Sequence, residues 1–290
     1  MPGFWFVDTH SRLSRNKTPV NETGVLFFSR KVTRKMITVS KFGGTSMATA
    51  DSIRQVANIL KANENRTICV VSAPGKTDEY LKMTDLLIHN HRHACIERVI
   101  RLVHDLHLDH NVLERALAKL AESQRVPSLP NRVAFGEWLS AWLLSHVTGW
   151  RMVDADEVVF FEEDRVTVNI TWSKSERVIV PGFYGHDVCT GNIRTFPRGG
   201  SDITASLVAE KVGATLCENW TDVPGVFDKD PNRHDDAIAY EELSYTQLLQ
   251  VAHGGAQVFH RDAIAPLQVA NIPLRIRSTF APHAPGTLVT

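Results

Sequence analysis

The hydrophobic and polar positions of this chain alternate between two patterns, one typical of amphipathic helices and one typical of buried strands. Residues 47–61 place apolar side chains every three or four positions, which is the spacing of one helix face, whereas residues 67–72 form a short apolar run typical of a buried strand. The same reasoning predicts helices over 83–122, 135–146, 201–212, 245–252 and 263–270, and strands over 37–42, 151–155, 158–161, 166–170, 178–180, 215–219 and 274–278.

Strands that alternate with helices of this length predict an α/β fold with a mainly parallel sheet covered by helices. Ligands of such folds gather at the carboxyl ends of the strands. Three conspicuous loops follow Phe42, Val71 and Asn219, each at the end of a predicted strand. We therefore expect the functional site to lie where these loops meet.

The composition gives no sign of a nucleic-acid or membrane partner. Lys and Arg together number 32, as do Asp and Glu, so no overall field attracts a polyanion. The four cysteines are scattered without a CxxC spacing, which suits a reducing compartment and predicts a cytoplasmic protein. No apolar run has the length of about 18 residues that a membrane span needs.

Residues 1–35 differ from the rest of the chain. They are basic and have no sustained period, so we expect a flexible extension or a product of translation that starts upstream of Met36. A mitochondrial address is the less favoured alternative, because no clean amphipathic helix is present.

The first loop contains the adjacent glycines Gly43 and Gly44. They let the backbone approach a ligand closely, and the following helix, which we expect Ser46 to cap, offers free N–H groups to a phosphate. Lys41 leaves the strand just before the turn and can reach the same phosphate. The loop lacks the Walker A pattern, and a plain Gly-Gly turn explains the glycines equally well.

The second loop, residues 197–202, repeats this logic with two glycines before a helix that Ser201 is expected to cap. Arg198 lies upstream of the glycines. Asp202 in the first turn either complements the helix dipole or holds a metal ion or positions Lys41. Two such junctions in one chain favour a shared anion site.

The third loop, residues 219–227, combines a Pro-Gly turn with Arg233 shortly after it. It can frame a flat heterocycle and offer a guanidinium to phosphates. A turn-rich connection explains it as well.

Taken in order, these motifs resemble the aspartokinases of the amino-acid kinase family. The resemblance covers residues 37–290 and rests on collinear blocks. They are Lys41-Phe42-Gly43-Gly44-Thr45-Ser46, Val70-Val71-Ser72-Ala73-Pro74-Gly75-Lys76, Met83-Thr84-Asp85-Leu86-Leu87, Gly136-Glu137, Pro181-Gly182-Phe183-Tyr184-Gly185, Arg198-Gly199-Gly200-Ser201-Asp202, Trp220-Thr221-Asp222-Val223-Pro224-Gly225-Val226 and Pro285-Gly286-Thr287-Leu288-Val289.

The resemblance implies a three-layer αβα sandwich with an amino-acid-binding lobe (36–195) and a nucleotide-binding lobe (196–290). It implies transfer of a phosphoryl group from ATP to the side-chain carboxylate of L-aspartate, which gives 4-phospho-L-aspartate and opens the lysine, threonine and methionine pathway. The family commonly pairs through its catalytic lobes, so the resemblance also admits a homodimer.

Residue roles follow from the same resemblance. Lys41 would neutralise the transferring phosphoryl group, helped by Mg²⁺ carried on ATP rather than bound directly by the protein, and Asp202 would orient Lys41 or the metal-nucleotide. The substrate would be held by Thr45, Glu137, Arg198 and Ser201. The nucleotide would be held by Lys41, Gly43, Gly44, Ser72, Thr221, Asp222, Phe227 and Arg233.

The chain departs from the family pattern in three ways. Gln257 stands where many relatives carry a lysine near the phosphates, and Pro197 stands where small hydroxyl residues and glycine are usual. The chain also stops at Thr290, without the ACT domains that bind lysine or threonine, so we expect neither amino acid to inhibit it.

Two alternatives remain open at this point. One is a kinase of the same fold with a related acceptor, and the other is a non-catalytic, kinase-like regulatory subunit. The joint presence of Lys41, Glu137, Arg198 and Asp202 argues against the second.

Overall fold

The computed structural model describes residues 36–290 except 198, 230–233, 235 and 254–258. Its centre is an eight-stranded sheet in the order β10-β12-β11-β9-β1-β2-β6-β3, in which only the β11–β12 pair is antiparallel. The strands are β1 (Thr38–Phe42), β2 (Arg66–Val71), β3 (Arg151–Met152), β6 (Val178–Pro181), β9 (Leu216–Thr221), β10 (Glu242–Leu243), β11 (Leu274–Ser278) and β12 (Thr287–Val289).

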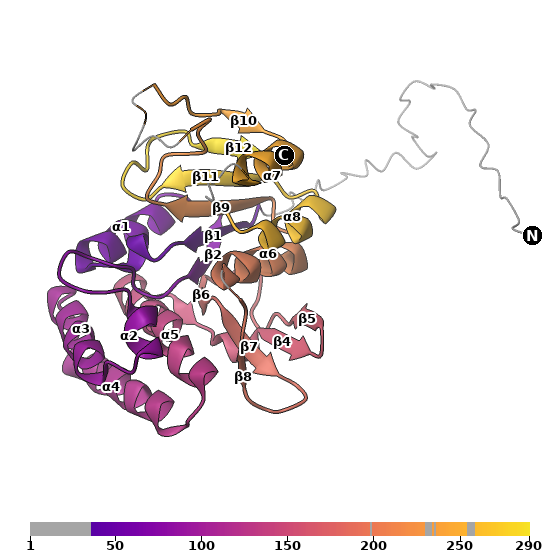
Figure 1. The fold of residues 1–290 in the computed structure, drawn as a ribbon. Helices are drawn as coiled ribbons and strands as arrows, with labels where there is room; N and C mark the ends of the chain where they lie inside the picture. Colours follow the sequence, from indigo (N-terminus) through magenta and orange to yellow (C-terminus); the bar gives the residue numbers. More distant parts are fainter. Residues whose placement is uncertain (1–35, 198, 230–233, 235, 254–258) are drawn as a thin grey trace, which may run out of the picture. The chain divides into compact units, whose positions relative to one another are not determined.

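Helices cover both faces of this sheet, so the predicted three-layer αβα sandwich is confirmed (Figure 1). One face carries α1 (Ala50–Lys61), α2 (Met83–Ile88), α3 (Arg92–Asp105), α4 (His110–Arg125) and α5 (Leu129–Thr148). The other carries α6 (Gly200–Val212), α7 (Tyr245–His253) and α8 (Ile264–Val269). Short 3₁₀ turns are η1 (Thr45–Met47), η2 (Ala155–Glu157) and η3 (Arg261–Ala263).

The two cores follow from the side-chain alternation of the strands. In β2, Cys69 and Val71 pack against α1–α5, while Ile68 and Val70 pack against α6–α8. A strand that is buried on both faces needs apolar residues at every position, which explains its continuous apolar run. The sheet contains strands from both 36–195 and 196–290, and the division into two lobes stays a prediction.

A second, four-stranded sheet lies beside the first, in the order β5-β4-β7-β8. Its strands are β4 (Val159–Glu162), β5 (Arg165–Val168), β7 (Tyr184–Asp187) and β8 (Ile193–Thr195). The pattern predicted β4 and β5 but missed β7, β8, β10 and β12. These four strands are short, and β7 contains Gly185 and the polar His186 and Asp187, so they carry little apolar signal.

The long helical region predicted over residues 83–122 is helical in the structure, but it is divided into the three helices α2, α3 and α4. The chain turns at Asn90 and His107, which adopt positive φ angles of 54° and 57°. A left-handed residue after a helix ends its hydrogen-bond ladder. The hydrophobic spacing runs through both breaks and therefore concealed them.

A buried ion pair inside the sheet joins Arg66 of β2 to Glu218 of β9, the two strands that flank β1. Glu218 accepts hydrogen bonds from the Arg66 guanidinium at 2.7 and 2.9 Å, from Ser40 Oγ at 2.8 Å and from the Trp220 indole at 3.0 Å. Burial alone would raise the pKa of Glu218, but these donors outweigh it and the pKa is lowered. Glu218 is therefore ionised and fully partnered beneath the carboxyl ends of β1 and β9.

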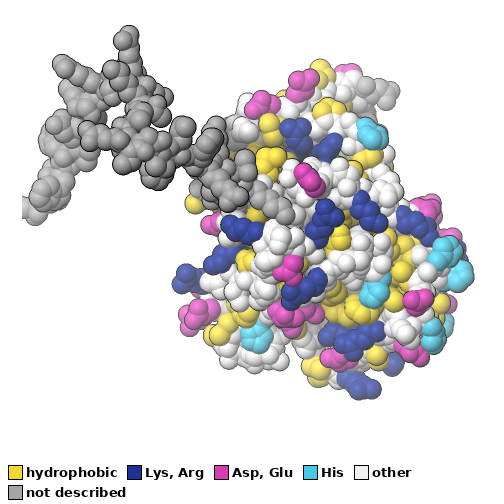
Figure 2. All heavy atoms as spheres, turned by 180° about the vertical axis from the view of Figure 1, so that it is seen from behind, with side chains coloured by type: hydrophobic (Ala, Val, Ile, Leu, Met, Phe, Trp, Pro, Cys, Tyr) yellow, Lys and Arg dark blue, Asp and Glu magenta, His cyan; other side chains and the backbone are white. Residues whose placement is uncertain are grey.

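The face of the molecule in Figure 2 has no strong charge asymmetry. Figure 2 shows basic and acidic side chains interspersed over one face, in keeping with a formal net charge of zero. None of the helices in the described part of the chain combines the length and apolar character that a membrane crossing requires.

Candidate active site

The floor of the site is made by the carboxyl ends of four adjacent parallel strands, β9, β1, β2 and β6. The residue after each of the last three strands donates its N–H to the end of the neighbouring strand. These bonds run from Gly43 to Trp220 (3.0 Å), from Ser72 to Phe42 (3.1 Å) and from Gly182 to Val71 (2.9 Å). The loops that leave these strands are thus held side by side, as the sequence predicts.

Gly44 and Gly75 let the first two loops touch. The N–H of Gly75 donates to the Gly44 carbonyl at 2.8 Å, and a Cβ on Gly75 would lie 2.5 Å from the Gly44 carbonyl carbon. No side chain fits between backbones this close. At Gly43 a Cβ would meet its nearest atom, the Trp220 carbonyl oxygen, at 3.6 Å, which is an ordinary van der Waals contact.

A cavity of about 750 Å³ lies above this floor. Seven of the residues predicted for the site line it: Lys41, Gly43, Gly44, Ser72, Glu137, Ser201 and Asp202. The sequence reasoning did not single out Lys82, Thr84, Asp85, Phe183, Phe259 or His260, which line it too. A signal was present for Thr84, Asp85 and Phe183, because they belong to motif blocks that are quoted above without roles for these residues.

Lys41 and Asp202 meet in this cavity. The Lys41 Nζ lies 2.5 Å from Asp202 Oδ1, and both side chains are largely buried. Lys41 shares its sheet face with Val39, which packs toward α6, and Asp202 lies in the first turn of α6. Asp202 Oδ2 also accepts the backbone N–H of His260 at 3.1 Å, which fixes the carboxylate. An ammonium is thereby held at the edge of an open cavity.

The N-terminus of α6 faces the same space. Gly199 is the N-cap with φ of 82°, and Gly200 and Ser201 begin the helix, so the prediction that Ser201 caps it is wrong. A Cβ on Gly199 would lie 2.2 Å from the His260 ring, which leaves room only for glycine. The first N–H groups of a helix lack partners within it and attract anions.

The other predicted cap is wrong as well. Thr49 caps α1 through a capping box with Ser52, whereas Ser46 is buried and its hydroxyl lies 2.7 Å from that of Thr279. Ser46 lies within a 3₁₀ turn that precedes the helix, and sequence spacing does not reveal such a turn.

Glu137 is a buried acid on α5, and it faces the cavity. Its side chain is 5% exposed, and Oε2 has no hydrogen-bond partner among the residues that the structure describes. Burial raises the pKa of Glu137 to about 7, although the Ala73 backbone and the Lys82 ammonium partly offset it. An unpartnered acid of this kind favours a cationic ligand group.

Several predicted site residues lie elsewhere. Thr45, Thr221, Asp222 and Phe227 do not line the cavity, and the Thr221 hydroxyl donates to the Asp222 carboxylate at 3.0 Å. Arg198, Arg233 and Gln257 lie outside the described residues. The roles given to all seven stay predictions.

Comparisons with known proteins agree with this architecture. Residues 36–278 match the model of the amino acid kinase family. Aspartokinase 3 of Bacillus subtilis is 31% identical over 288 residues, which is 87% of this chain and 63% of that protein. The chloroplastic aspartokinase 1 of Arabidopsis thaliana is 32% identical over 307 residues, which is 90% of this chain and 53% of that protein.

Solved structures show the same likeness. The Clostridium acetobutylicum aspartate kinase has a TM-score of 0.77 at 32% identity, covering 87% of this chain and 63% of that one. Escherichia coli aspartokinase III, solved with aspartate and ADP, has a TM-score of 0.73 at 27% identity, with 87% and 64% covered. This chain thus spans between about half and two-thirds of its relatives' length. With the matched model spanning most of its length, the chain belongs to the amino acid kinase family.

Proposed function

We propose that this protein transfers the γ-phosphoryl group of ATP to the side-chain carboxylate of L-aspartate, releasing ADP and 4-phospho-L-aspartate. The observation that carries the proposal is one cavity in which the Lys41–Asp202 pair occurs together with the buried acid Glu137, whose Oε2 has no hydrogen-bond partner among the described residues. The likeness to an aspartokinase solved with aspartate and ADP supports the choice of substrates.

For this reaction the protein has to align the two substrates and supply positive charge to the transferring phosphoryl group. A carboxylate with a pKa near ~3.9 is ionised at neutral pH, so the nucleophile needs no general base. It must instead approach an anionic phosphate in line, which requires cations at the transferring group. Lys41 supplies one such charge, and Asp202 holds its ammonium in place.

Separate positions in and around the cavity would hold the two substrates. Glu137, with Lys82 nearby, would pair with the α-ammonium of aspartate, and Arg198 would take its α-carboxylate. Thr45 and Ser201 would hold the remaining substrate oxygens. The Gly43-Gly44 backbone and the start of α6 would hold the phosphates, with Ser72, Thr221, Asp222, Phe227 and Arg233 completing the nucleotide side.

Magnesium would enter with the nucleotide. The carboxylates that line the cavity are Asp85, Glu137 and Asp202, and Asp202 is already paired with Lys41. No group of three candidate metal ligands occurs in the described residues. Because Mg²⁺ is commonly held by one or two carboxylates plus substrate phosphates, binding on ATP fits this donor set. The ion would neutralise phosphate charge there.

In the cell, this reaction would open lysine, threonine and methionine synthesis in the cytoplasm. We propose the division into an amino-acid lobe (36–195) and a nucleotide lobe (196–290), and pairing into a homodimer, on the same resemblance.

Coupled ADP release tests the proposal, with hydroxylamine to trap the acyl phosphate as a hydroxamate. L-aspartate should support turnover, whereas its β-methyl ester, which lacks the nucleophilic carboxylate, should not. Lys41→Ala and Asp202→Ala should each lower kcat at least about 10²-fold, the loss typical of one transition-state contact. Lys61→Ala, at an exposed position of α1, is the matched control. Turnover that survives both site substitutions, or no turnover with L-aspartate, contradicts the proposal.

A further inference from the structure

A second cavity, of about 310 Å³, lies between helices α4 and α5 and the small sheet. It shares no lining residue with the candidate active site. Helix α5 separates the two, because Glu137 lines the first cavity and its neighbour Trp138 lines the second. Nothing in the proposed phosphoryl transfer uses this space.

One end of the second cavity is acidic. Asp154 accepts a hydrogen bond from the buried Tyr184 hydroxyl at 2.5 Å, which fixes its position. Asp156, on η2, makes no hydrogen bond or ion pair with its side chain within the described residues. Burial raises the pKa of Asp156, and the nearby charges of Asp154 and Glu157 raise it further. The charges of Lys119 and His186 lower the pKa of Asp156 in part, but neither residue forms an ion pair with Asp156 in the described part of the chain. The two neighbouring carboxylates would therefore stabilise a ligand ammonium group.

The opposite end offers donors. Lys119 Nζ lies 3.7 Å from Glu122 Oε1, a loose ion pair, and 6.0 Å from the centroid of the Trp138 ring. Trp138 is 5% exposed, yet its indole N–H donates to no acceptor in the part of the chain that the structure describes. Trp138 lines the cavity, so this N–H is available to an acceptor on a ligand bound there.

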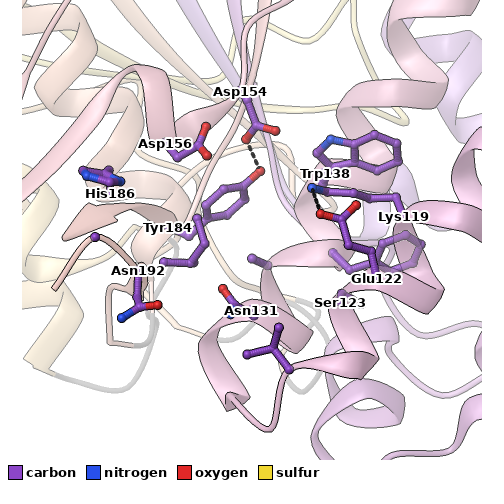
Figure 3. A pocket seen from close by; sticks show the side chains of 15 residues that line it. Lys119, Glu122, Ser123, Asn131, Trp138, Asp154, Asp156, Tyr184, His186 and Asn192 are labelled. Atoms are coloured by element: carbon purple, nitrogen blue, oxygen red, sulfur yellow. Dashed lines mark hydrogen bonds and ion pairs between the residues drawn. The ribbon is translucent and has the colours of Figure 1, made fainter.

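Figure 3 shows the two ends facing each other. Lys119 and Trp138 lie on one side, and Asp154 and Asp156 lie on the other side together with Tyr184, whose hydroxyl bonds Asp154. The Phe135 ring stacks on the Trp138 ring, with 6.1 Å between the ring centroids, and contributes an apolar surface to the cavity. A ligand that satisfies both ends must therefore carry its opposite charges apart, across an apolar spacer.

We propose that this second cavity binds a small ω-aminocarboxylate, with its ammonium at Asp154 and Asp156 and its carboxylate at Lys119 and the Trp138 N–H. The proposal is independent of the phosphoryl-transfer reaction, since it rests on other residues. It requires only that the two groups span the cavity.

Calorimetric titration of the full chain tests this with 4-aminobutanoate, 5-aminopentanoate and 6-aminohexanoate, each up to about 10 mM, where weak specific sites fill. We expect one chain length to bind best. Pentanoate and 1-aminopentane, which each lack one charged group, should bind at least tenfold more weakly. Absence of binding by all three aminocarboxylates, or equal binding of 1-aminopentane, overturns the proposal.

Variants then locate the bound molecule. The double substitution Asp154→Asn and Asp156→Asn keeps an acceptor for Tyr184 and should weaken binding at least tenfold, whereas Asp164→Asn, at an exposed position outside the cavity, should not change it. Glu137→Gln alters only the first cavity and should leave binding intact. Binding lost in Glu137→Gln but kept in the double variant would place the ligand in the first cavity and overturn the proposal.

Discussion

Glu137 is expected to lower the stability of the free protein at neutral pH while serving ligand binding. Burial raises the pKa of Glu137 from 4.5 to about 7. The folded state therefore holds this proton more tightly than the unfolded state. Below pH 4.5 the acid is protonated in both states and costs nothing, and as pH rises toward about 7 the unfolded state gains by ionising first.

The size of the effect follows from the same two values. The gap between about 7 and 4.5 corresponds to about 3 kcal/mol, at ~1.4 kcal/mol for each pH unit. Glutamine has nearly the same shape and never ionises. Glu137→Gln should therefore match the wild type near pH 4.5 and exceed its free energy of unfolding by about 3 kcal/mol at about pH 8.

Urea unfolding of both proteins across this pH range, in the absence of ligands, measures the difference. A constant difference between the two proteins at all pH values, or a variant that is less stable at about pH 8, would refute the reasoning. If the proposed function holds, the variant should also lose affinity for aspartate, because the acceptor of the α-ammonium is gone. The wild-type KM for aspartate should then rise as pH falls below about 7.

Three further predictions concern other parts of the structure. Gly75→Ala should cost about 1–3 kcal/mol or more in stability, because its Cβ would lie 2.5 Å from the backbone of the neighbouring loop; thermal unfolding measures this. Arg66→Met should cost about 3–5 kcal/mol in urea unfolding, since it leaves the buried Glu218 carboxylate without its cation. A thiol reagent should modify one cysteine in the native protein, because Cys189 is exposed and the other three are buried.

Each of these predictions has a matched control in the chain. Gly43→Ala should leave stability nearly unchanged, as its Cβ would meet its nearest atom at 3.6 Å. Asp51→Asn breaks an exposed ion pair with Arg54 and should cost less than about 1 kcal/mol. Equal losses from the paired substitutions would contradict the packing and burial arguments. Labelling that persists in Cys189→Ser would contradict the third prediction.

Much of the architecture could be predicted from the amino-acid sequence alone. The continuous apolar run of β2 and the helical spacing of α1 are local properties, so they indicated a sheet buried on both faces between helices. The glycine loops at the strand ends predicted the position of the cavity, because parallel strands bring their carboxyl ends to one edge of the sheet. The backbone turns at Asn90 and His107 were not predicted, because a residue in the left-handed conformation leaves the hydrophobic pattern unchanged.

The electrostatics of the site were decided only by the tertiary structure. Lys41 and Asp202 are far apart in the chain, and their 2.5 Å contact depends on β1 packing against α6. The raised pKa of Glu137 and the lowered pKa of Glu218 are opposite outcomes for two buried acids. Glu137 forms no ion pair in the described part of the chain, whereas Glu218 pairs with Arg66. Burial and hydrogen-bond partners are properties of the packed fold. The sequence therefore indicates which residues can be charged, and the tertiary structure determines the free energy of each charged form.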